Sequence, residues 1–317
     1  MKLLNIDSFS DLQSKSVVTV GMFDGVHVGH RHLLRRLQEV AKERDLLPVV
    51  VTFDRHPRQV LRPDDPVPLL STFEERMCLL EACGVENVAI IHFDKETASL
   101  SACTFAERFL CGNLNMGVLL LGYDNMFGSR VSNDFDLLPD LASRRGFAIC
   151  RDDAVVLSGV EVSSTKIRRA LTSGNMVLAN SMLGAPYSVS GKVVHGRHVG
   201  SGLGFPTANI AVDDPNKLLP APGVYAMNAL VGGRRYAAMA NLGAQPTFHT
   251  SAPALEVHII DFSSDIYGQR VTVEFLDKIR DIQTFDSPQA LVEQLKDDCS
   301  KVKALCSNTP PLTSLME

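Results

Sequence analysis

The sequence predicts an α/β domain with a parallel sheet, followed by a small antiparallel β-barrel that a C-terminal helix closes. From residue 17 to about 160, short apolar runs alternate with stretches at helical spacing, as in a Rossmann-like parallel sheet covered on both faces. Beyond residue 187 come short strand-like runs, many glycines and several prolines, a texture typical of a small barrel. We therefore expect domains at residues 1–184 and 185–306, and a loose tail at 307–317.

The first domain should contain four buried strands, at residues 17–20, 47–53, 88–92 and 118–122. After the first strand, apolar residues recur at the spacing of an amphipathic helix: Leu33, Leu34, Leu37, Val40 and Ala41. A helix is expected after Ser71, because Ser71 and Glu74 have the spacing of a capping box. Further helices are predicted over residues 103–111 and 164–183.

The second domain should contain five strands, at residues 187–195, 224–231, 235–241, 255–260 and 271–275. Its closing helix is expected to begin with Ser287 as the N-cap and Pro288 in the first helical position.

Composition limits the possible partners. The net charge of -5 disfavours a general nucleic-acid binder, and the 317 residues hold no apolar run long enough for a membrane span and no signal-peptide pattern. Seven cysteines, an odd number never in CxxC spacing, favour reduced thiols over disulfides or a zinc site. We expect a cytoplasmic protein with no nucleic-acid or membrane partner. Composition leaves its oligomeric state open.

The first candidate site is a glycine-rich turn between a strand and a helix, in the run Gly21-Met22-Phe23-Asp24-Gly25-Val26-His27-Val28-Gly29-His30. Glycines let the backbone approach a ligand, and a helix N-terminus offers N–H groups to a phosphate. His27 and His30 would add side-chain donors. The alternative is that the two histidines cap the helix or lie in solvent.

A second phosphate candidate opens the helix predicted at residues 164–183. Ser163, Ser164 and Thr165 place three hydroxyls at its start, and Arg168 follows about one turn later. Backbone N–H, hydroxyl and guanidinium groups can together hold phosphate oxygens. Ordinary N-capping by Ser163 or Ser164 is the alternative. Asp54 and residues 122–124 follow predicted strands, at the sheet edge where ligands bind in such folds.

The third candidate is the segment Gly204-Phe205-Pro206-Thr207-Ala208-Asn209. In an extended strand Thr207 and Asn209 face the same side, so both side-chain oxygens could reach one Mg²⁺ held by ATP phosphates. The alternative is a turn with an Asx-type hydrogen bond.

The histidine motif at a strand-to-helix turn resembles the nucleotidylyltransferase superfamily, and residues 23–30 resemble the flavin adenylyltransferase module of bacterial FAD synthetases. Residues 52–58, 120–124 and 162–171 resemble its other segments, in the expected order. The resemblance implies that ATP and FMN give FAD and pyrophosphate, with Mg²⁺. It also implies roles for individual residues: phosphate contacts for Gly21, Phe23, Asp24, Gly25, His27, Gly29 and His30, pyrophosphate binding for Ser163, Ser164, Thr165 and Arg168, a nucleotide contact for Asp124, and flavin contacts for Asp54 and Tyr123.

The segment at residues 204–209 is similar to riboflavin kinases, and residues 220–226, 241–243, 246–248 and 256–262 resemble the same module in order. This implies ATP-dependent phosphorylation of riboflavin to FMN, with Glu256 as the base for the riboflavin hydroxyl. The implied ligands are Gly191, Gly204, Pro206 and Thr207 for the nucleotide, Thr207 and Asn209 for the metal, and Arg280 for the flavin.

The chain departs from these patterns at three positions. Asn125 and Met126 stand where relatives commonly have an aromatic residue and a cation, and Ser201 replaces an arginine for which Arg197 or His198 could substitute. The leading hypothesis is a bifunctional riboflavin kinase and FMN adenylyltransferase. One alternative is a monofunctional FAD synthetase whose barrel only binds flavin, and another is a non-enzymatic, flavin-binding regulatory protein.

Overall fold

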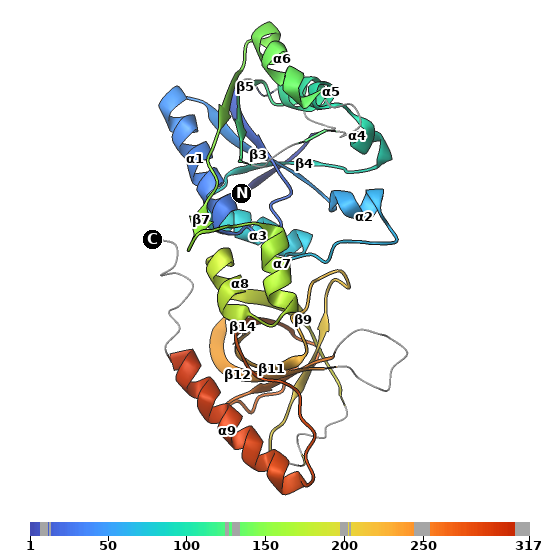
Figure 1. Cartoon of the computed structure of the whole chain (residues 1–317), viewed down its shortest axis with the longest axis vertical. Helices are drawn as coiled ribbons and strands as arrows, with labels where there is room; N and C mark the ends of the chain where they lie inside the picture. Colours follow the sequence, from blue (N-terminus) through green and yellow to red (C-terminus); the bar gives the residue numbers. More distant parts are fainter. Residues whose placement is uncertain are drawn as a thin grey trace. The chain divides into compact units, whose positions relative to one another are not determined.

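A computed structural model of the chain describes residues 1–6, 12, 14–123, 127–128, 134–196, 202, 204–243 and 254–307. The chain forms two compact units, Met1–Ser163 and Ser164–Glu317 (Figure 1). In the described part, no helix combines the length and the apolar character that a membrane span requires. All seven cysteines are free thiols.

The first unit is built on a parallel sheet of six strands in the order β1-β4-β3-β2-β5-β6. The strands are β1 (Lys2–Asn5), β2 (Ser16–Val20), β3 (Leu47–Phe53), β4 (Asn87–Ile91), β5 (Met116–Leu121) and β6 (Ala148–Arg151). Every residue of β2 is buried, and its side chains alternate between two apolar cores: Val18 and Val20 lie in one, Val17 in the other. Both faces of the sheet are therefore covered, as the sequence predicted.

The helices of this unit are α1 (Val28–Arg44), α2 (Pro57–Leu61), α3 (Phe73–Ala82), α4 (Lys95–Ser99), α5 (Ala102–Phe105), the π-helix η1 (Ala106–Asn113), the 3₁₀-helix η2 (Phe135–Leu137) and α6 (Leu138–Arg145). A short hairpin follows, β7 (Val156–Leu157) and β8 (Val160–Glu161). The five apolar residues that predicted α1 are all buried in it.

The first unit differs from the predictions in several features, and its helices α2, α4, η2 and α6 and the hairpin of β7 and β8 were not predicted. Strands β1 and β6 at the two edges of the sheet were not predicted. The predicted helix over residues 103–111 is a short α-helix that continues as a π-helix. The capping box of α3 is formed by Thr72 and Glu75, not by Ser71 and Glu74, because the Ser71 side chain is engaged elsewhere.

The second unit contains two short helices, a closed barrel and a final helix. The helices are α7 (Ser164–Thr172), α8 (Met176–Leu183) and α9 (Pro288–Ser307). The barrel has the order β10-β13-β12-β11-β14-β9, with strands β9 (Tyr187–Val194), β10 (Ala208–Val212), β11 (Gly223–Val231), β12 (Arg234–Gly243), β13 (Ala254–Ile259) and β14 (Arg270–Arg280). All its strand pairs are antiparallel, and the predicted barrel with its closing helix is confirmed.

Two details of the second unit correct the predictions and one confirms them. The single helix predicted over residues 164–183 is broken at Gly174, whose φ of 76° is left-handed, and Asn175 caps a new helix. Strand β10 was not predicted, because a turn was an equal interpretation of its sequence. The Oγ of Ser287 accepts a hydrogen bond from the N–H of Ala290 at 3.2 Å, as expected of the N-cap of α9.

The two compact units divide at Ser163/Ser164, so α7 and α8 fold with the barrel. The N–H of Ala221 donates to the carbonyl of Leu171 at 3.0 Å, and the Asn180 side chain donates to the carbonyl of Phe275 at 2.9 Å. Domain limits of 1–184 and 185–306 for the two functional modules stay a prediction. The expected tail, from residue 308 on, lies outside the described residues.

Candidate functional site

The glycine-rich turn connects β2 to α1 in a strained conformation. Phe23 and Val26 have left-handed backbones, with φ of 52° and 38°, and Gly25 has φ of 80°. Such a backbone in a residue other than glycine costs of the order of 1–3 kcal/mol. A Cβ on Gly21 would lie 3.0 Å from the Phe23 ring, and one on Gly29 would lie 3.2 Å from the His27 ring. These glycines make room for side chains within the turn.

His27 is the N-cap of α1, so the capping role considered for the histidines is present. Its Nδ1 accepts a hydrogen bond from the N–H of His30 at 3.3 Å, and the two imidazole rings stack with centroids 3.6 Å apart. A neutral imidazole that accepts through Nδ1 carries its proton on Nε2. The cap therefore assigns Nε2 as the hydrogen-bond donor of His27.

His30 is held as a neutral imidazole. Burial, together with the neighbouring His27, lowers the pKa of His30 well below its usual value. Its Nδ1 is buried and has no hydrogen-bond partner among the residues that the structure describes. The Phe23 ring packs edge-on against it, with centroids 5.2 Å apart. A bound anion would raise the pKa of His30, because it would stabilise the protonated ring.

Asp24 anchors the turn from inside. Its carboxylate accepts hydrogen bonds from the N–H of Leu70 at 3.1 Å, the N–H of Ser71 at 2.9 Å and the Oγ of Ser71 at 3.1 Å. Only 2% of Asp24 is exposed. The structure thus places this predicted phosphate-site residue in the support of the turn.

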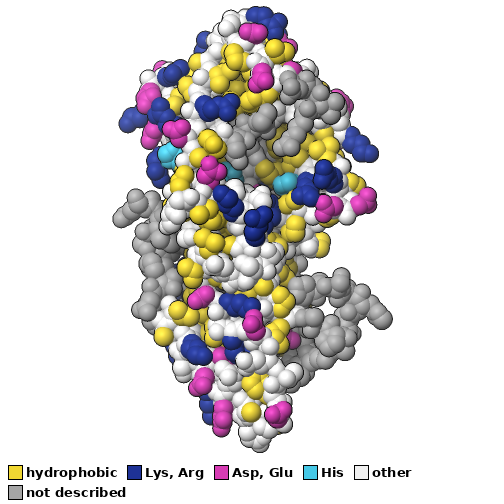
Figure 2. Space-filling model, in the orientation of Figure 1, with side chains coloured by type: hydrophobic (Ala, Val, Ile, Leu, Met, Phe, Trp, Pro, Cys, Tyr) yellow, Lys and Arg dark blue, Asp and Glu magenta, His cyan; other side chains and the backbone are white. Residues whose placement is uncertain are grey.

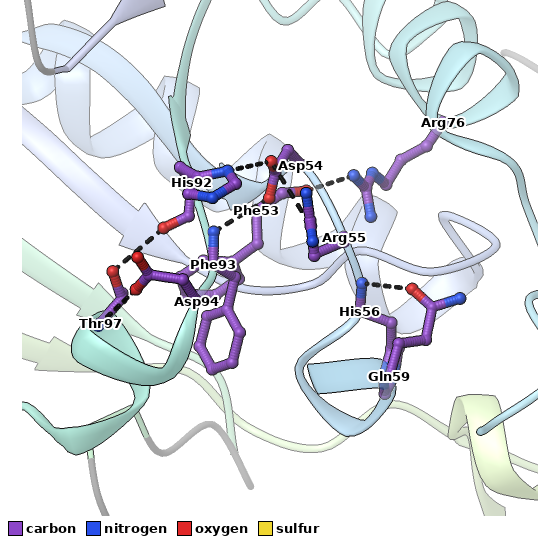
Figure 3. A network of polar contacts seen from close by, with 10 residues as sticks. All are labelled: Phe53, Asp54, Arg55, His56, Gln59, Arg76, His92, Phe93, Asp94 and Thr97. Carbon is purple, nitrogen blue, oxygen red and sulfur yellow. Dashed lines mark hydrogen bonds and ion pairs between the residues drawn. The ribbon is translucent and has the colours of Figure 1, made fainter. Parts of the chain in front are cut away.

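Asp54 lies at the end of β3, beside the end of β4. Its carboxylate contacts the Nδ1 of His92 at 2.6 Å and accepts from the N–H of Phe93 at 2.9 Å, with Arg55 nearby (Figure 3). Burial alone would raise the pKa of Asp54, but these neighbours outweigh burial and lower it. Figure 2 shows histidine side chains around a hollow, one of them beside a group of Lys and Arg side chains.

His92 was missed in the sequence, because a single histidine at a strand end belongs to no motif. Its only signal was its position at the end of the strand predicted at residues 88–92. The structure places His92 one strand away from Asp54, in the register that pairs Phe53 with Ile91.

Arg76 of α3 was missed altogether. It is 1% exposed, and its guanidinium donates to the carbonyl of Met22 at 3.1 Å. It also donates to the carbonyl of Phe53, as Figure 3 shows. Its Nε is buried without a hydrogen-bond partner among the residues that the structure describes. Burial lowers the pKa of Arg76 to about 10. Arginine on a helix normally indicates a solvent-exposed face, so its burial could not be anticipated.

The serine-rich segment begins a helix as predicted: α7 starts at Ser164, and Arg168 lies one turn further along. Within the first unit, the carbonyl of Val162 would lie 4.0 Å from a Cβ on Gly29, so the chain just before this segment passes the histidine turn. Tyr123 follows β5 and is 55% exposed. Asp124, Asn125 and Met126 lie outside the described residues.

In the barrel, the strand register brings the predicted metal ligand and the predicted base together. Asn209 of β10 is paired directly with Glu256 of β13, which is paired on its other side with Asn241 of β12. Directly paired residues have their Cβ atoms about 5 Å apart on the same face. The neighbouring residues Leu255 and Val257 are buried on the opposite face. An amide, a carboxylate and a second amide therefore form one polar row.

The segment that precedes Asn209 is tied to the same strand. Gly204 has φ of 85°, and the carbonyl of Pro206 accepts a hydrogen bond from Nδ1 of His258 at 2.8 Å. The Phe205 ring packs edge-on against His258, with centroids 5.4 Å apart. Because His258 is two residues from Glu256 and on the same face, this bond holds the segment containing Thr207 beside the polar row.

Two further predicted residues of the barrel, Gly191 and Arg280, have structural contacts. A Cβ on Gly191 would lie 2.3 Å from the carbonyl oxygen of Ala211, so Gly191 allows β9 and β10 to pair closely. Arg280 forms an ion pair of 2.8 Å with the fully buried Asp298, which links β14 to α9. Ser201, Arg197 and His198 lie outside the described residues.

Both halves of the chain match models of known protein families. A family model described as FAD synthetase matches residues 9–166, and one described as riboflavin kinase matches residues 183–306. The chain is 38% identical to the bifunctional riboflavin kinase/FMN adenylyltransferase of Escherichia coli strain K12, over 90% of this chain and 91% of the relative. It is 34% identical to the protein of the same description from Bacillus subtilis, over 93% and 94%.

A solved structure from Streptococcus pneumoniae, described as a macrolide-efflux protein, is 34% identical and has a TM-score of 0.83. The match covers 95% of this chain and 98% of that one. The two family models follow one another in the order of the two units, and the bifunctional relatives are matched over almost their whole length. The chain therefore belongs to the family of bifunctional riboflavin kinase/FMN adenylyltransferases.

Proposed function

We propose that this chain makes FAD in two steps: its barrel phosphorylates riboflavin to FMN, and its α/β module adenylylates FMN. The observation that carries the proposal is the histidine turn, in which a helix N-terminus, His27 and a neutral His30 converge at the end of β2. The paired Asn209 and Glu256 support the kinase half. Membership of a family whose relatives are described by these two activities supports both halves.

In the adenylyl transfer, a phosphate oxygen of FMN attacks the α-phosphorus of ATP. The bond from that phosphorus to its bridging oxygen breaks, and pyrophosphate leaves. No covalent intermediate is required, so positioning and charge stabilisation carry the catalysis. The N–H groups at the start of α1, Nε2 of His27 and His30 would bind the phosphates. Ser163, Ser164, Thr165 and Arg168 would hold the departing pyrophosphate, Asp124 the nucleotide, and Asp54 and Tyr123 the flavin.

In the kinase step, the riboflavin 5′-hydroxyl attacks the γ-phosphorus of ATP and ADP leaves. Glu256 would accept the hydroxyl proton. Thr207 and Asn209 offer hydroxyl and amide oxygens, the donors that suit Mg²⁺, beside that carboxylate. When bound, Mg²⁺ would neutralise charge on the ATP phosphates. Gly191, Gly204 and Pro206 would line the nucleotide, and Arg280 would lie near the flavin.

The substitution Glu256→Gln tests the kinase half. It keeps the size and hydrogen bonding of the side chain but removes the proton acceptor, so riboflavin phosphorylation should fall by at least about 100-fold. FMN adenylylation, measured in the same sample, should be unchanged. Glu293→Gln on the exposed side of α9 is the matched control and should change neither activity. Normal phosphorylation by Glu256→Gln would remove Glu256 from its assigned role.

Ser201 is the observation that favours a second candidate, a monofunctional FAD synthetase whose barrel only binds flavin. In that case the unmodified chain would form FAD from FMN but no FMN from riboflavin, and Ser201→Arg would be the first repair to test. Two further expectations from the sequence stay predictions: a cytoplasmic location, and the absence of nucleic-acid and membrane partners. The sequence predicts no particular oligomeric state.

A further inference from the structure

A short segment of the first unit, Leu70 to Arg76, forms the back of the histidine turn. It contains the last residues before α3 and the first turn of that helix. The Ser71 hydroxyl donates to the carboxylate of Asp24 at 3.1 Å and accepts from the N–H of Gly25 at 2.8 Å. One hydroxyl has a single donor and two acceptor sites, so Ser71 can serve both neighbours at once.

These bonds act where the turn is strained. Gly25 lies between Phe23 and Val26, the two residues that adopt left-handed backbones, and Val26 directly precedes the helix cap His27. Left-handed backbone in bulky residues persists only where the surrounding structure fixes it. The contacts from Ser71 to both Asp24 and Gly25 supply that constraint. Ser71 is 2% exposed, which keeps water from competing for its hydroxyl.

Arg76 fixes the turn from its other side. It donates to the carbonyl of Met22, at the entrance to the turn, and to the carbonyl of Phe53, at the end of β3. The hydroxyl of Thr52 donates to the same Met22 carbonyl at 3.3 Å. One guanidinium therefore sets the spacing between the strand end that leads to His27 and the strand end that leads to Asp54.

We propose that Ser71 and Arg76 are positioning residues for adenylyl transfer, which hold the histidine turn in its strained shape without touching substrate. The inference rests on the proposed function of that turn. A shift of about 1 Å in catalytic groups can cost about 100-fold in rate. Loss of the Ser71 hydroxyl should therefore lower the turnover rate for FAD formation while substrate affinity changes little.

The experiment compares Ser71→Ala, Ser71→Thr and Thr72→Ala in the full chain. FAD formation from FMN is measured as kcat and KM for ATP and for FMN, and riboflavin phosphorylation by the barrel serves as an internal measure of intact protein. Ser71→Ala should lower kcat for FAD formation by about 10- to 100-fold, with KM within about threefold of the parent. Ser71→Thr keeps the hydroxyl and should restore most of kcat.

Thr72→Ala is the matched control, because it removes the cap of the same helix, the bond from the N–H of Glu75 at 3.2 Å, but leaves the contacts of Ser71 in place. It should lower the unfolding temperature at least as much as Ser71→Ala and leave kcat near that of the parent. Equal losses of kcat in both variants would assign Ser71 to helix stability and overturn the positioning role.

Arg76→Lys provides an independent test, because lysine keeps the charge but cannot span both carbonyls in the same way. We expect kcat for FAD formation to fall at least tenfold in folded protein, as judged by circular dichroism, without loss of riboflavin phosphorylation. An active parent with fully active Ser71→Ala and Arg76→Lys variants would overturn the positioning role alone. A parent that forms no FAD from FMN would overturn the proposed function and the positioning role with it.

Discussion

His27 has two tasks in the histidine turn: it caps helix α1, and its ring offers a hydrogen-bond donor to a ligand. Nδ1 stabilises the start of α1, and this same bond leaves the proton on Nε2 for a ligand. His30 is buried, and its pKa is lowered, so it remains neutral at physiological pH. Two neutral rings can stack closely where two charged rings would repel each other.

The substitution His27→Asn separates these tasks. Asparagine is a good N-cap, so it should keep the helix start intact while removing the imidazole donor. We expect FAD formation to fall about 100-fold or more, with an unfolding temperature close to that of the parent. His32→Asn, on the exposed side of α1, is the matched control and should leave FAD formation unchanged. Full activity of a folded His27→Asn variant would contradict the role of the ring.

The lowered pKa of His30 predicts a loss of stability in acid. Below about pH 6.5 the unfolded chain binds a proton at His30 that the folded chain does not, so the free energy of unfolding falls as pH falls through this range. Relative to His30→Asn, which cannot titrate, the parent should lose roughly 1 kcal/mol between pH 6.5 and 5.5. Urea unfolding at the two pH values measures this difference, and an equal pH dependence in parent and variant would refute it.

At the scale of elements, periodic burial was the most reliable sequence signal. The five apolar residues of α1 were placed correctly, because they form one continuous buried face. The strand at residues 47–53 was placed correctly, because it is buried on both faces. Edge strands β1 and β6 were missed, since short strands at a sheet edge carry little pattern. Gly174 was read as part of a helix because its backbone angle depends on tertiary contacts.

The candidate site was also predictable only in part, because motifs mark some of its residues but not the residues that support them. Motifs marked His27 and His30 at the start of α1, and Glu256 within β13. Their supports come from segments distant in sequence: Ser71, just before α3, and Arg76, on α3, contact the histidine turn. Ser71 was predicted as part of a capping box, and Arg76 stands in no recognisable motif, so only the folded structure reveals their partners at the turn.

Pairing of β9 with β10 positions Asn209, and it depends on Gly191. In Gly191→Ala the new Cβ would meet the carbonyl oxygen of Ala211 at 2.3 Å, a backbone atom that cannot move aside cheaply. We expect the barrel to lose about 2–3 kcal/mol of unfolding free energy and most of its riboflavin phosphorylation, while FMN adenylylation persists. Gly233→Ala, with φ of 77° but no atom within 4 Å, should cost only about 1 kcal/mol. Equal effects of the two substitutions would rule out the close approach as the cause.

The whole chain combines two modules, and we predict that the adenylyl-transfer module works without the barrel. A fragment of residues 1–186 contains every residue assigned to adenylyl transfer and should form FAD from FMN without phosphorylating riboflavin. It lacks the barrel contacts of α7 and α8, such as the bond from Asn180 to Phe275, so its unfolding temperature should lie below that of the full chain. A soluble fragment without activity would mean that the module boundary lies elsewhere.

The central claim is that one chain performs both steps. Purified full-length protein should be incubated with riboflavin, ATP and Mg²⁺, and the flavins separated by chromatography over time. We predict that FMN appears first, that FAD follows at its expense, and that pyrophosphate is released in proportion to FAD. A sample that forms no FMN from riboflavin, or no FAD from added FMN, would contradict this claim.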